Sequence, residues 1–232
     1  MFERGLFWLK NFRRTKNFDL LAALPLILWF LLMGVRPQAP ITLKLLFELI
    51  NGTISLFNFL QLITLLGSLV LMFVLIYLLI TRRTPELRSR GVLPRVVAFC
   101  GTFLGNVFPL LAPAQLTLPG QALAAILIIT GTIGAIVAAS RLGGSYSLMP
   151  EARKLVTTGP YSVIRHPLYL AEMIGILGLV LQFQQPWSLL LGAMAFGLQY
   201  WRTVFEERVL LRAYPDYATY RARTWRFLPY VF

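Results

Sequence analysis

The chain has 232 residues, of which 57% are hydrophobic and 13% charged, and its mean hydropathy is +0.70. Soluble domains are about 45–50% apolar and about 25% charged, so the composition excludes an ordinary soluble domain. The net charge of +13 lies in short segments between apolar runs. That placement suits anionic lipid headgroups and argues against a nucleic-acid binder, which would carry a basic face on a soluble domain.

Apolar runs predict about six transmembrane helices, because about 20 residues cross the hydrocarbon core. A basic segment precedes the first run, but no signal-peptide cleavage site follows it, so we expect a retained helix. Residues 41–51 are expected to form a short interfacial helix on the far side. The turn Gln184-Gln185-Pro186 joins the last two runs into a helical hairpin. In chain order the runs are 20–35, 56–80, 96–116, 122–139, 168–183 and 187–205.

Basic residues alternate between the segments that connect these runs. Lys and Arg gather in the N-terminal segment (Arg4, Lys10, Arg13, Arg14, Lys16), in the second and fourth loops and in the C-terminal segment, whereas the third loop and the hairpin turn hold none. The alternation follows the positive-inside rule and places both termini on the cytoplasmic side. The sequence therefore predicts an all-α, polytopic membrane helix bundle.

The polar residues that could bind a ligand or take part in a reaction are unevenly distributed between two parts of the chain. Residues 1–140 hold the first four predicted helices with basic cytoplasmic segments, and residues 141–232 hold a loop, the hairpin and a C-terminal tail rich in polar groups. The chain has one cysteine, Cys100, and one histidine, His166. No metal site is expected from so few ligands.

Glu172 lies about 9 Å inside the fifth predicted helix, at 1.5 Å per residue. An ionisable residue in a span is costly and faces a partner or a polar cavity. Two interpretations stay open: a site at the cytoplasmic membrane boundary, or a structurally paired or snorkelling acid.

Arg202 and Glu206 stand four residues apart near the end of the sixth run and so share one helix face. The spacing fits an intrahelical ion pair. It also fits a site in which Arg202 binds an anionic group through its planar fork and Glu206 faces a cation.

The fifth predicted helix begins with a strong start signal. The dipeptide Gly159-Pro160 favours a turn, and Pro167 suits the first turn of a helix. The free backbone N–H groups and the dipole at such a start suit a carboxylate. His166 stands at this position, either as a cap or surface residue or as part of the site.

Two blocks of residues, within 143–232, resemble the isoprenylcysteine carboxyl methyltransferase family, which is related to the membrane phospholipid N-methyltransferases. The first block is Leu155-Val156-Thr157, Gly159-Pro160-Tyr161 and Arg165-His166-Pro167-Leu168-Tyr169. The second is Arg202, then Glu206-Glu207, Tyr217, Tyr220 and Arg226-Phe227-Leu228-Pro229.

The resemblance implies an S-adenosylmethionine-dependent methyltransferase with a cytoplasmic cofactor pocket between the loop before the hairpin and the C-terminal segment. Arg202 matches the residue that orients the substrate carboxylate in that family. Arg202 and Glu206 are the implied catalytic residues, and Arg202 and Glu172 lie on the substrate side. The implied cofactor contacts are Tyr146, Arg153, Lys154, Leu155, Val156, Tyr161, His166, Pro167, Leu168, Tyr169 and Glu206.

The chain departs from the family pattern at three places. Arg153-Lys154 stands where a histidine-containing pair is common, and Tyr214-Pro215 replaces a common Phe-Gly. Ala171-Glu172 brings an acid where a glycine is frequent. The resemblance implies a lipidic or amphipathic acceptor that enters from the bilayer. Arg202 favours a carboxylate, and a phospholipid amine, with Glu172 as its partner, or a small thiol are the alternatives. A transporter or a membrane scaffold is the non-enzymatic alternative.

Overall fold

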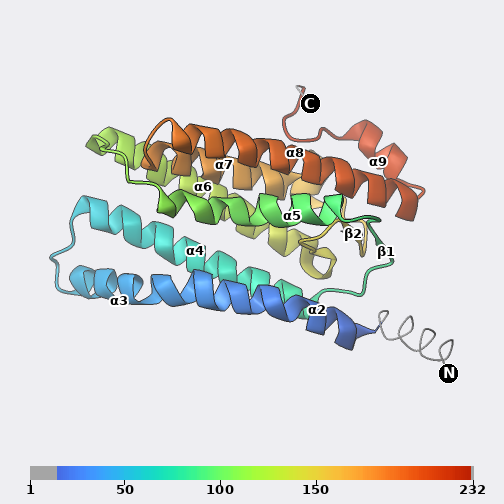
Figure 1. The fold of residues 1–232 in the computed structure, drawn as a ribbon, viewed down its shortest axis with the longest axis horizontal. Coiled ribbons are helices and arrows are strands. Elements are labelled where there is room, and N and C mark those ends of the chain that lie inside the picture. Colours follow the sequence, from blue (N-terminus) through green and yellow to red (C-terminus); the bar gives the residue numbers. More distant parts are fainter. Residues whose placement is uncertain (1–14, 231–232) are drawn as a thin grey trace.

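The structure, a computed structural model, describes residues 15–230, and long helices that run side by side make up most of them (Figure 1). The all-α class is confirmed. The basic residues Arg4, Lys10, Arg13 and Arg14 lie outside the described residues. The helices are α2 Lys16–Trp29, α3 Arg36–Ile50, α4 Leu56–Thr81, α5 Leu93–Phe103, α6 Leu118–Leu142, α7 Pro167–Gln182, α8 Trp187–Ala213 and α9 Tyr217–Arg223.

The first helix is longer than the sequence predicts. A loop was expected after residue 35 and a separate interfacial helix over residues 41–51, but a π-helical stretch, Phe30–Val35, joins α2 to α3. The backbone hydrogen bonds change from the π-helical to the α-helical pattern at the start of α3. Pro37 stands in this first turn, where a missing N–H is tolerated. The continuous segment Lys16–Ile50 has 35 residues. At about 52 Å it exceeds the hydrocarbon thickness of about 30 Å.

The third predicted helix ends earlier than its apolar run. α5 stops at Phe103, and a 3-10 helix, Leu104–Leu110, follows it. Pro109 has no N–H to donate and its ring clashes with the preceding turn, which explains why an α-helix does not continue to residue 116.

Within residues 15–230, four helical segments are long and apolar enough to cross a membrane: Lys16–Ile50, Leu56–Thr81, Leu93–Leu110 and Leu118–Ser145. α7 is apolar but has 16 residues, and α8 has 27 residues but carries charges in its second half. The bundle is thus polytopic in character, and the number of six spans stays a prediction.

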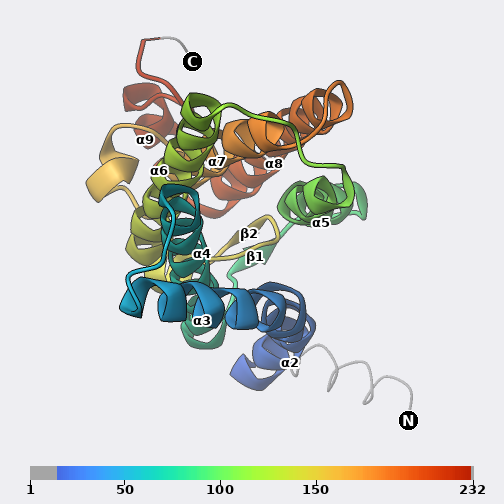
Figure 2. The ribbon, with the colours of Figure 1, turned by 90° about the vertical axis from the view of Figure 1, so that its left-hand side faces the viewer.

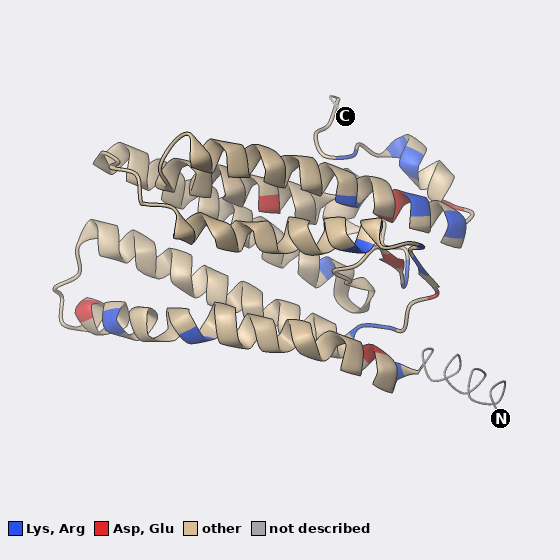
Figure 3. Ribbon diagram, in the orientation of Figure 1, with Lys and Arg blue, Asp and Glu red and all other residues tan. Residues whose placement is uncertain are grey.

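Charges concentrate at one end of the bundle, here called the basic end, where α4 and α6 end, α5 and α7 begin, and α8 meets α9 (Figures 1 and 3). Seen along the helices, α6 lies between α4 and α7, and α5 lies beside α8 (Figure 2). At the basic end, β1 Leu87–Arg88 pairs antiparallel with β2 Glu151–Ala152. The chain segments after α4 and after α6 therefore meet there.

A buried ion-pair cluster joins α2 to these two segments. Asp19 on α2 is 1% exposed, and its carboxylate accepts hydrogen bonds from Arg82 at 2.8 Å and from Arg153 at 2.9 Å. Arg153 also donates to Glu151 at 2.6 Å. Because two cations share one buried carboxylate, the cluster fixes the first helix against the chain that follows α6.

Small residues set the distance between α6 and α7. A Cβ atom added to Gly131 of α6 would lie 2.5 Å from the backbone nitrogen of Gly175 on α7 and 2.7 Å from the Ala171 carbonyl oxygen. One at Gly178 would lie 2.6 Å from the Ala124 carbonyl oxygen. Such small residues allow helix backbones in membranes to approach closely, so this contact positions the start of α7.

Gly131→Ala should lower the stability of the folded protein by about 1–3 kcal/mol, because the new methyl group meets backbone atoms that cannot move aside. Unfolding of the purified protein in detergent, followed by circular dichroism, measures the change. Gly197→Ala on α8 is the matched control, since its Cβ meets nothing within 4 Å. If both variants unfold alike, the close α6–α7 contact is not what Gly131 supports.

Candidate active site

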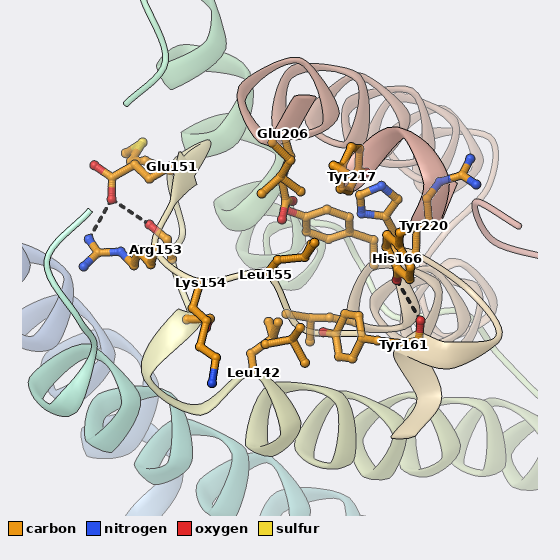
Figure 4. A pocket seen from close by; sticks show the side chains of 18 residues that line it. Leu142, Glu151, Arg153, Lys154, Leu155, Tyr161, His166, Glu206, Tyr217 and Tyr220 are labelled. Atoms are coloured by element: carbon orange, nitrogen blue, oxygen red, sulfur yellow. Dashed lines mark hydrogen bonds and ion pairs between the residues drawn. The ribbon is translucent and has the colours of Figure 1, made fainter. Parts of the chain in front are cut away.

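A pocket opens at the basic end and encloses about 700 Å³ of empty space, including the part open to solvent (Figure 4). Its walls come from the segment between α6 and α7, the first turn of α7, the last turns of α8, and α9. The lining residues are Leu142, Ser145, Ser147, Met149, Glu151, Arg153, Lys154, Leu155, Val156, Tyr161, Arg165, His166, Leu168, Tyr169, Glu206, Leu210, Tyr217 and Tyr220.

Backbone hydrogen bonds tie the residues before α7 to the C-terminal segment. The Arg165 N–H donates to the Trp225 carbonyl at 2.7 Å, and the His166 N–H donates to the Arg226 carbonyl at 3.2 Å. The Trp225 N–H returns a bond to the Val163 carbonyl at 3.2 Å. The start of the hairpin and the end of the chain therefore close one side of the pocket together.

Glu207 reinforces this closure from inside the fold. Its carboxylate is held by Arg165 at 3.0 Å and by Arg226 at 3.0 Å, and the His166 Nε2 atom lies 3.1 Å from the same carboxylate. Glu207 is 3% exposed. The His166 ring thus lines the pocket and also contacts Glu207. This contact with Glu207 gives His166 a structural role in addition to any role in ligand binding.

Glu206, the neighbouring acid, faces the pocket. Consecutive residues of an α-helix point about 100° apart, so Glu206 and Glu207 reach different surroundings. The Tyr169 hydroxyl donates a hydrogen bond of 2.8 Å to Glu206. In Figure 4 the Glu206 side chain points into the space bounded by Leu155, His166 and Tyr217. A carboxylate is therefore available to a cationic group in the pocket.

Tyrosines and aliphatic side chains form the rest of the lining. The Tyr220 hydroxyl donates to the Tyr161 carbonyl at 2.7 Å, and burial raises the pKa of Tyr220 to about 12. Burial, followed by the charge of Glu206, raises the pKa of Tyr161 well above its usual value. These hydroxyls therefore stay protonated. The Tyr217 hydroxyl is buried and has no hydrogen-bond partner among residues 15–230.

The structure brings most of the predicted cofactor residues to this pocket. Tyr146 and Pro167 are buried outside the lining. Arg153 borders the pocket, but its guanidinium turns toward Glu151 and Asp19, and its side chain is 0% exposed. The predicted contacts found in the lining are Arg153, Lys154, Leu155, Val156, Tyr161, His166, Leu168, Tyr169 and Glu206.

Arg202 forms a second polar group one turn before Glu206. Its Nη1 atom donates to Glu172 on α7 at 3.2 Å and to Gln199 at 2.8 Å. Gln199 donates to the same Glu172 oxygen at 2.5 Å. Of the two interpretations of Arg202, an ion pair is thus present, but its partner is Glu172 on the neighbouring helix α7 and not Glu206.

Tyr169 connects this ion pair with the pocket. The Arg202 guanidinium lies 4.5 Å from the centre of the Tyr169 ring, whose hydroxyl bonds Glu206. Arg202 is 4% exposed, and its Nε atom has no hydrogen-bond partner within the described chain. Burial, followed by the nearby charge of Glu172, raises the pKa of Tyr146, which places this tyrosine beside the same ion pair. The polar groups thus form one continuous series from the pocket into the bundle.

Sequence reasoning did not assign several lining residues. Tyr217 and Tyr220 belong to the motif quoted above, and their spacing of three residues on α9 was the one signal that could have placed both on one wall. Arg165 also belongs to the quoted motif, directly before His166. The others carry no distinctive pattern: Leu142, Ser145, Ser147, Met149, Glu151 and Leu210.

Comparisons with known proteins address the part of the chain that builds this site. The cobalt-zinc-cadmium resistance protein CzcN of Cupriavidus metallidurans is 43% identical over 76 residues, which cover 32% of this chain and 35% of that protein. The nickel-cobalt-cadmium resistance protein NccN of Alcaligenes xylosoxydans xylosoxydans is 39% identical over 80 residues, covering 34% and 38%. The chain thus matches little more than a third of the length of these curated relatives.

A family model extends over a longer stretch than either relative. The model for phospholipid methyltransferases matches residues 120–217, from the first turn of α6 to the first residue of α9. This stretch contains α7, α8 and most of the pocket lining. Residues 120–217 therefore form a domain of the phospholipid methyltransferase family, which is related to the isoprenylcysteine carboxyl methyltransferases.

Proposed function

We propose that the protein is an integral membrane methyltransferase that uses S-adenosylmethionine and acts on a lipidic or amphipathic acceptor. The observation that carries the proposal is the pocket at the basic end. It lies within a methyltransferase-family domain and combines a pocket-facing carboxylate, a helix start and aromatic walls. In this proposal both termini lie in the cytoplasm and the acceptor enters from the bilayer.

The residues present fit the cofactor. Glu206 would hold the ammonium group, and the first turn of α7 would hold the carboxylate through free backbone N–H groups. Tyr161, Tyr217 and Leu155 would enclose the nucleoside, with the unpartnered Tyr217 hydroxyl as a polar contact. When bound, the cofactor supplies a methyl group already activated on a sulfonium.

The work left to the protein is positioning. Tyr169 holds Glu206 by its hydroxyl and packs its ring against Arg202, so one side chain connects the two ends of the site. Aliphatic and aromatic walls keep water away from the reacting atoms. Such alignment can supply about 7–11 kcal/mol of the barrier.

A carboxylate acceptor is the first candidate, oriented by Arg202. A guanidinium binds carboxylates through two parallel N–H donors, and the Nε donor of Arg202 has no partner among the described residues. An incoming carboxylate would bond this donor and compete with Glu172 for Nη1. The reaction would then resemble isoprenylcysteine carboxyl methylation.

An amine acceptor is the second candidate, and the exposure of Glu172 supports it. The Glu172 side chain is 31% exposed, whereas that of Arg202 is 4% exposed. The acid is thus the accessible member of the pair and would hold a cationic headgroup. A small thiol would need neither charge.

Labelled methyl transfer from S-adenosylmethionine to matched acceptors decides among these classes. The acceptors are a prenylated cysteine with a free carboxylate, phosphatidylethanolamine and a small thiol, each offered to the purified protein. Incorporation into one of them identifies the class. A folded protein that neither binds S-adenosylmethionine nor transfers a methyl group would contradict the enzymatic proposal and leave the transporter and scaffold readings.

Glu206→Gln should weaken S-adenosylmethionine binding by roughly tenfold or more, because a hydrogen bond to a charged group contributes about 1.5–3 kcal/mol. Isothermal titration calorimetry in detergent measures the affinity. Glu48→Gln on α3, at the opposite end of the bundle, serves as the control and should bind normally. An unchanged affinity in a folded Glu206→Gln protein would reject the ammonium-binding role.

A further inference from the structure

A second cavity lies at the basic end, on the face of α8 turned away from the cofactor pocket. It is an open groove with about 1150 Å³ of empty space, part of it open to solvent. The chain between β1 and α5, the first residues of α5 and the last turns of α8 form its walls. Glu206 and Leu210 of the same helix line the cofactor pocket, so the end of α8 separates the two cavities.

Among the residues that the structure describes, three arginines and no carboxylate line this groove. They are Arg90, Arg208 and Arg212. All three are exposed, and none makes a salt bridge with another residue of the described range 15–230. Arg212 donates from Nε to the Arg208 carbonyl at 3.0 Å, which holds its side chain along the helix while the terminal nitrogens stay available. The groove is therefore a concentrated positive site without an internal counter-ion.

Apolar side chains accompany the arginines. Val92 is 73% exposed and Leu93 is 63% exposed, and Leu211 is exposed on the opposite wall. Phe205, at the inner end, lies 5.5 Å below the Arg208 guanidinium. Here the apolar run of α5 begins and that of α8 ends, so the groove lies at the depth where headgroups meet acyl chains.

We propose that this groove binds the phosphate of an anionic phospholipid in the leaflet that meets the basic end. Guanidinium groups bind phosphate oxygens bidentately, and arginine stems lie along apolar surface while their heads reach the phosphate. Acyl chains would cover Val92, Leu93 and Leu211. A soluble anion would leave these apolar residues uncovered, which favours the lipid as the occupant. The inference does not depend on methyl transfer.

The test uses the purified full-length protein and phosphatidylglycerol, with phosphatidylcholine as the neutral lipid. Native mass spectrometry, which resolves bound lipids, measures affinity. Arg208→Gln with Arg212→Gln should reduce phosphatidylglycerol affinity about fivefold for each arginine replaced. Arg36→Gln with Arg223→Gln removes the same charge from exposed positions outside the groove and should leave the affinity unchanged.

Several outcomes would overturn the proposal. Equal loss in the two double variants, with both folded by circular dichroism, would mean that only net charge matters. Equal binding of phosphatidylcholine by the unaltered protein would remove the requirement for an anionic headgroup. A third arm adds inorganic phosphate as competitor. Complete displacement of lipid by millimolar phosphate would identify a plain anion site instead of a lipid site.

Discussion

Asp19→Ala should destabilise the folded protein by about 3–5 kcal/mol, because it removes the carboxylate that the buried Arg82 guanidinium contacts and one of the two that Arg153 contacts. The side chains of Arg82 and Arg153, which both contact Asp19, are 6% and 0% exposed. Neither guanidinium can regain water without opening the contact between α2 and the segment after α6. Unfolding of the detergent-purified protein with sodium dodecyl sulfate, followed by circular dichroism, measures the loss.

A matched control comes from the ion pair at the far end of the bundle. Lys44 and Glu48 lie 3.9 Å apart, and the Lys44 side chain is 76% exposed. Lys44→Ala should change stability by about 0.5 kcal/mol or less, since exposed pairs of this spacing contribute little. Asp19→Asn should fall between the two variants because it keeps the shape and one acceptor. A stability loss for Asp19→Ala no larger than that of Lys44→Ala would show that the cluster does not hold the two parts together.

Arg202→Ala should lower the rate of methyl transfer by about 100-fold or more while S-adenosylmethionine affinity changes little. Arg202 lies outside the lining of the pocket where the cofactor is proposed to bind, so we expect binding not to need its guanidinium. It does hold Glu172 and stack on Tyr169, where the acceptor is proposed to sit. Loss of a preorganised charged donor typically costs 10²–10³ in turnover. Single-turnover transfer with calorimetry on the same sample separates the two effects.

Two further variants distinguish an orienting role from a structural one. Arg202→Lys keeps the charge but loses the planar fork of the guanidinium. Compared with Arg202→Ala, it should therefore restore the stability of the protein more than its rate of methyl transfer. Arg223→Ala, on the exposed end of α9, should match the unaltered protein in both assays. Parallel loss of cofactor affinity, turnover and thermal stability in Arg202→Ala would instead mark this residue as part of the fold.

The sequence predicted the start of a helix well where neighbouring residues alone determine it. α4, α7 and α8 begin within one residue of the predicted runs, because apolar length and a proline or serine start signal are local properties. The continuity of α2 with α3 was missed. The apolar run ends at Val35, before Arg36-Pro37, so the sequence predicts the end of a helix there, whereas a π-helical stretch continues the helix into α3.

Contacts between residues far apart in the sequence were also not predicted. Asp19 contacts residues 63 and 134 positions away, and no spacing rule connects them. The same limit applies to Arg202, for which sequence offered Glu206 one turn away, while the folded chain brings Glu172 from α7. The residues of the loop before α7 were assigned to the site by the family resemblance, because spacing alone does not show which side chains of a loop line one pocket.

The Asp19 cluster also bears on how this protein could be divided. The family match begins at residue 120, yet Arg153 within it contacts a carboxylate on the first helix, Asp19, as well as Glu151 of its own segment. A fragment cut at the family boundary would keep Glu151 but lose Asp19, so the buried guanidinium would have one acidic partner instead of two. Chimeras that graft residues 120–232 onto a foreign membrane anchor should therefore be more stable if the anchor supplies an acid at the corresponding place.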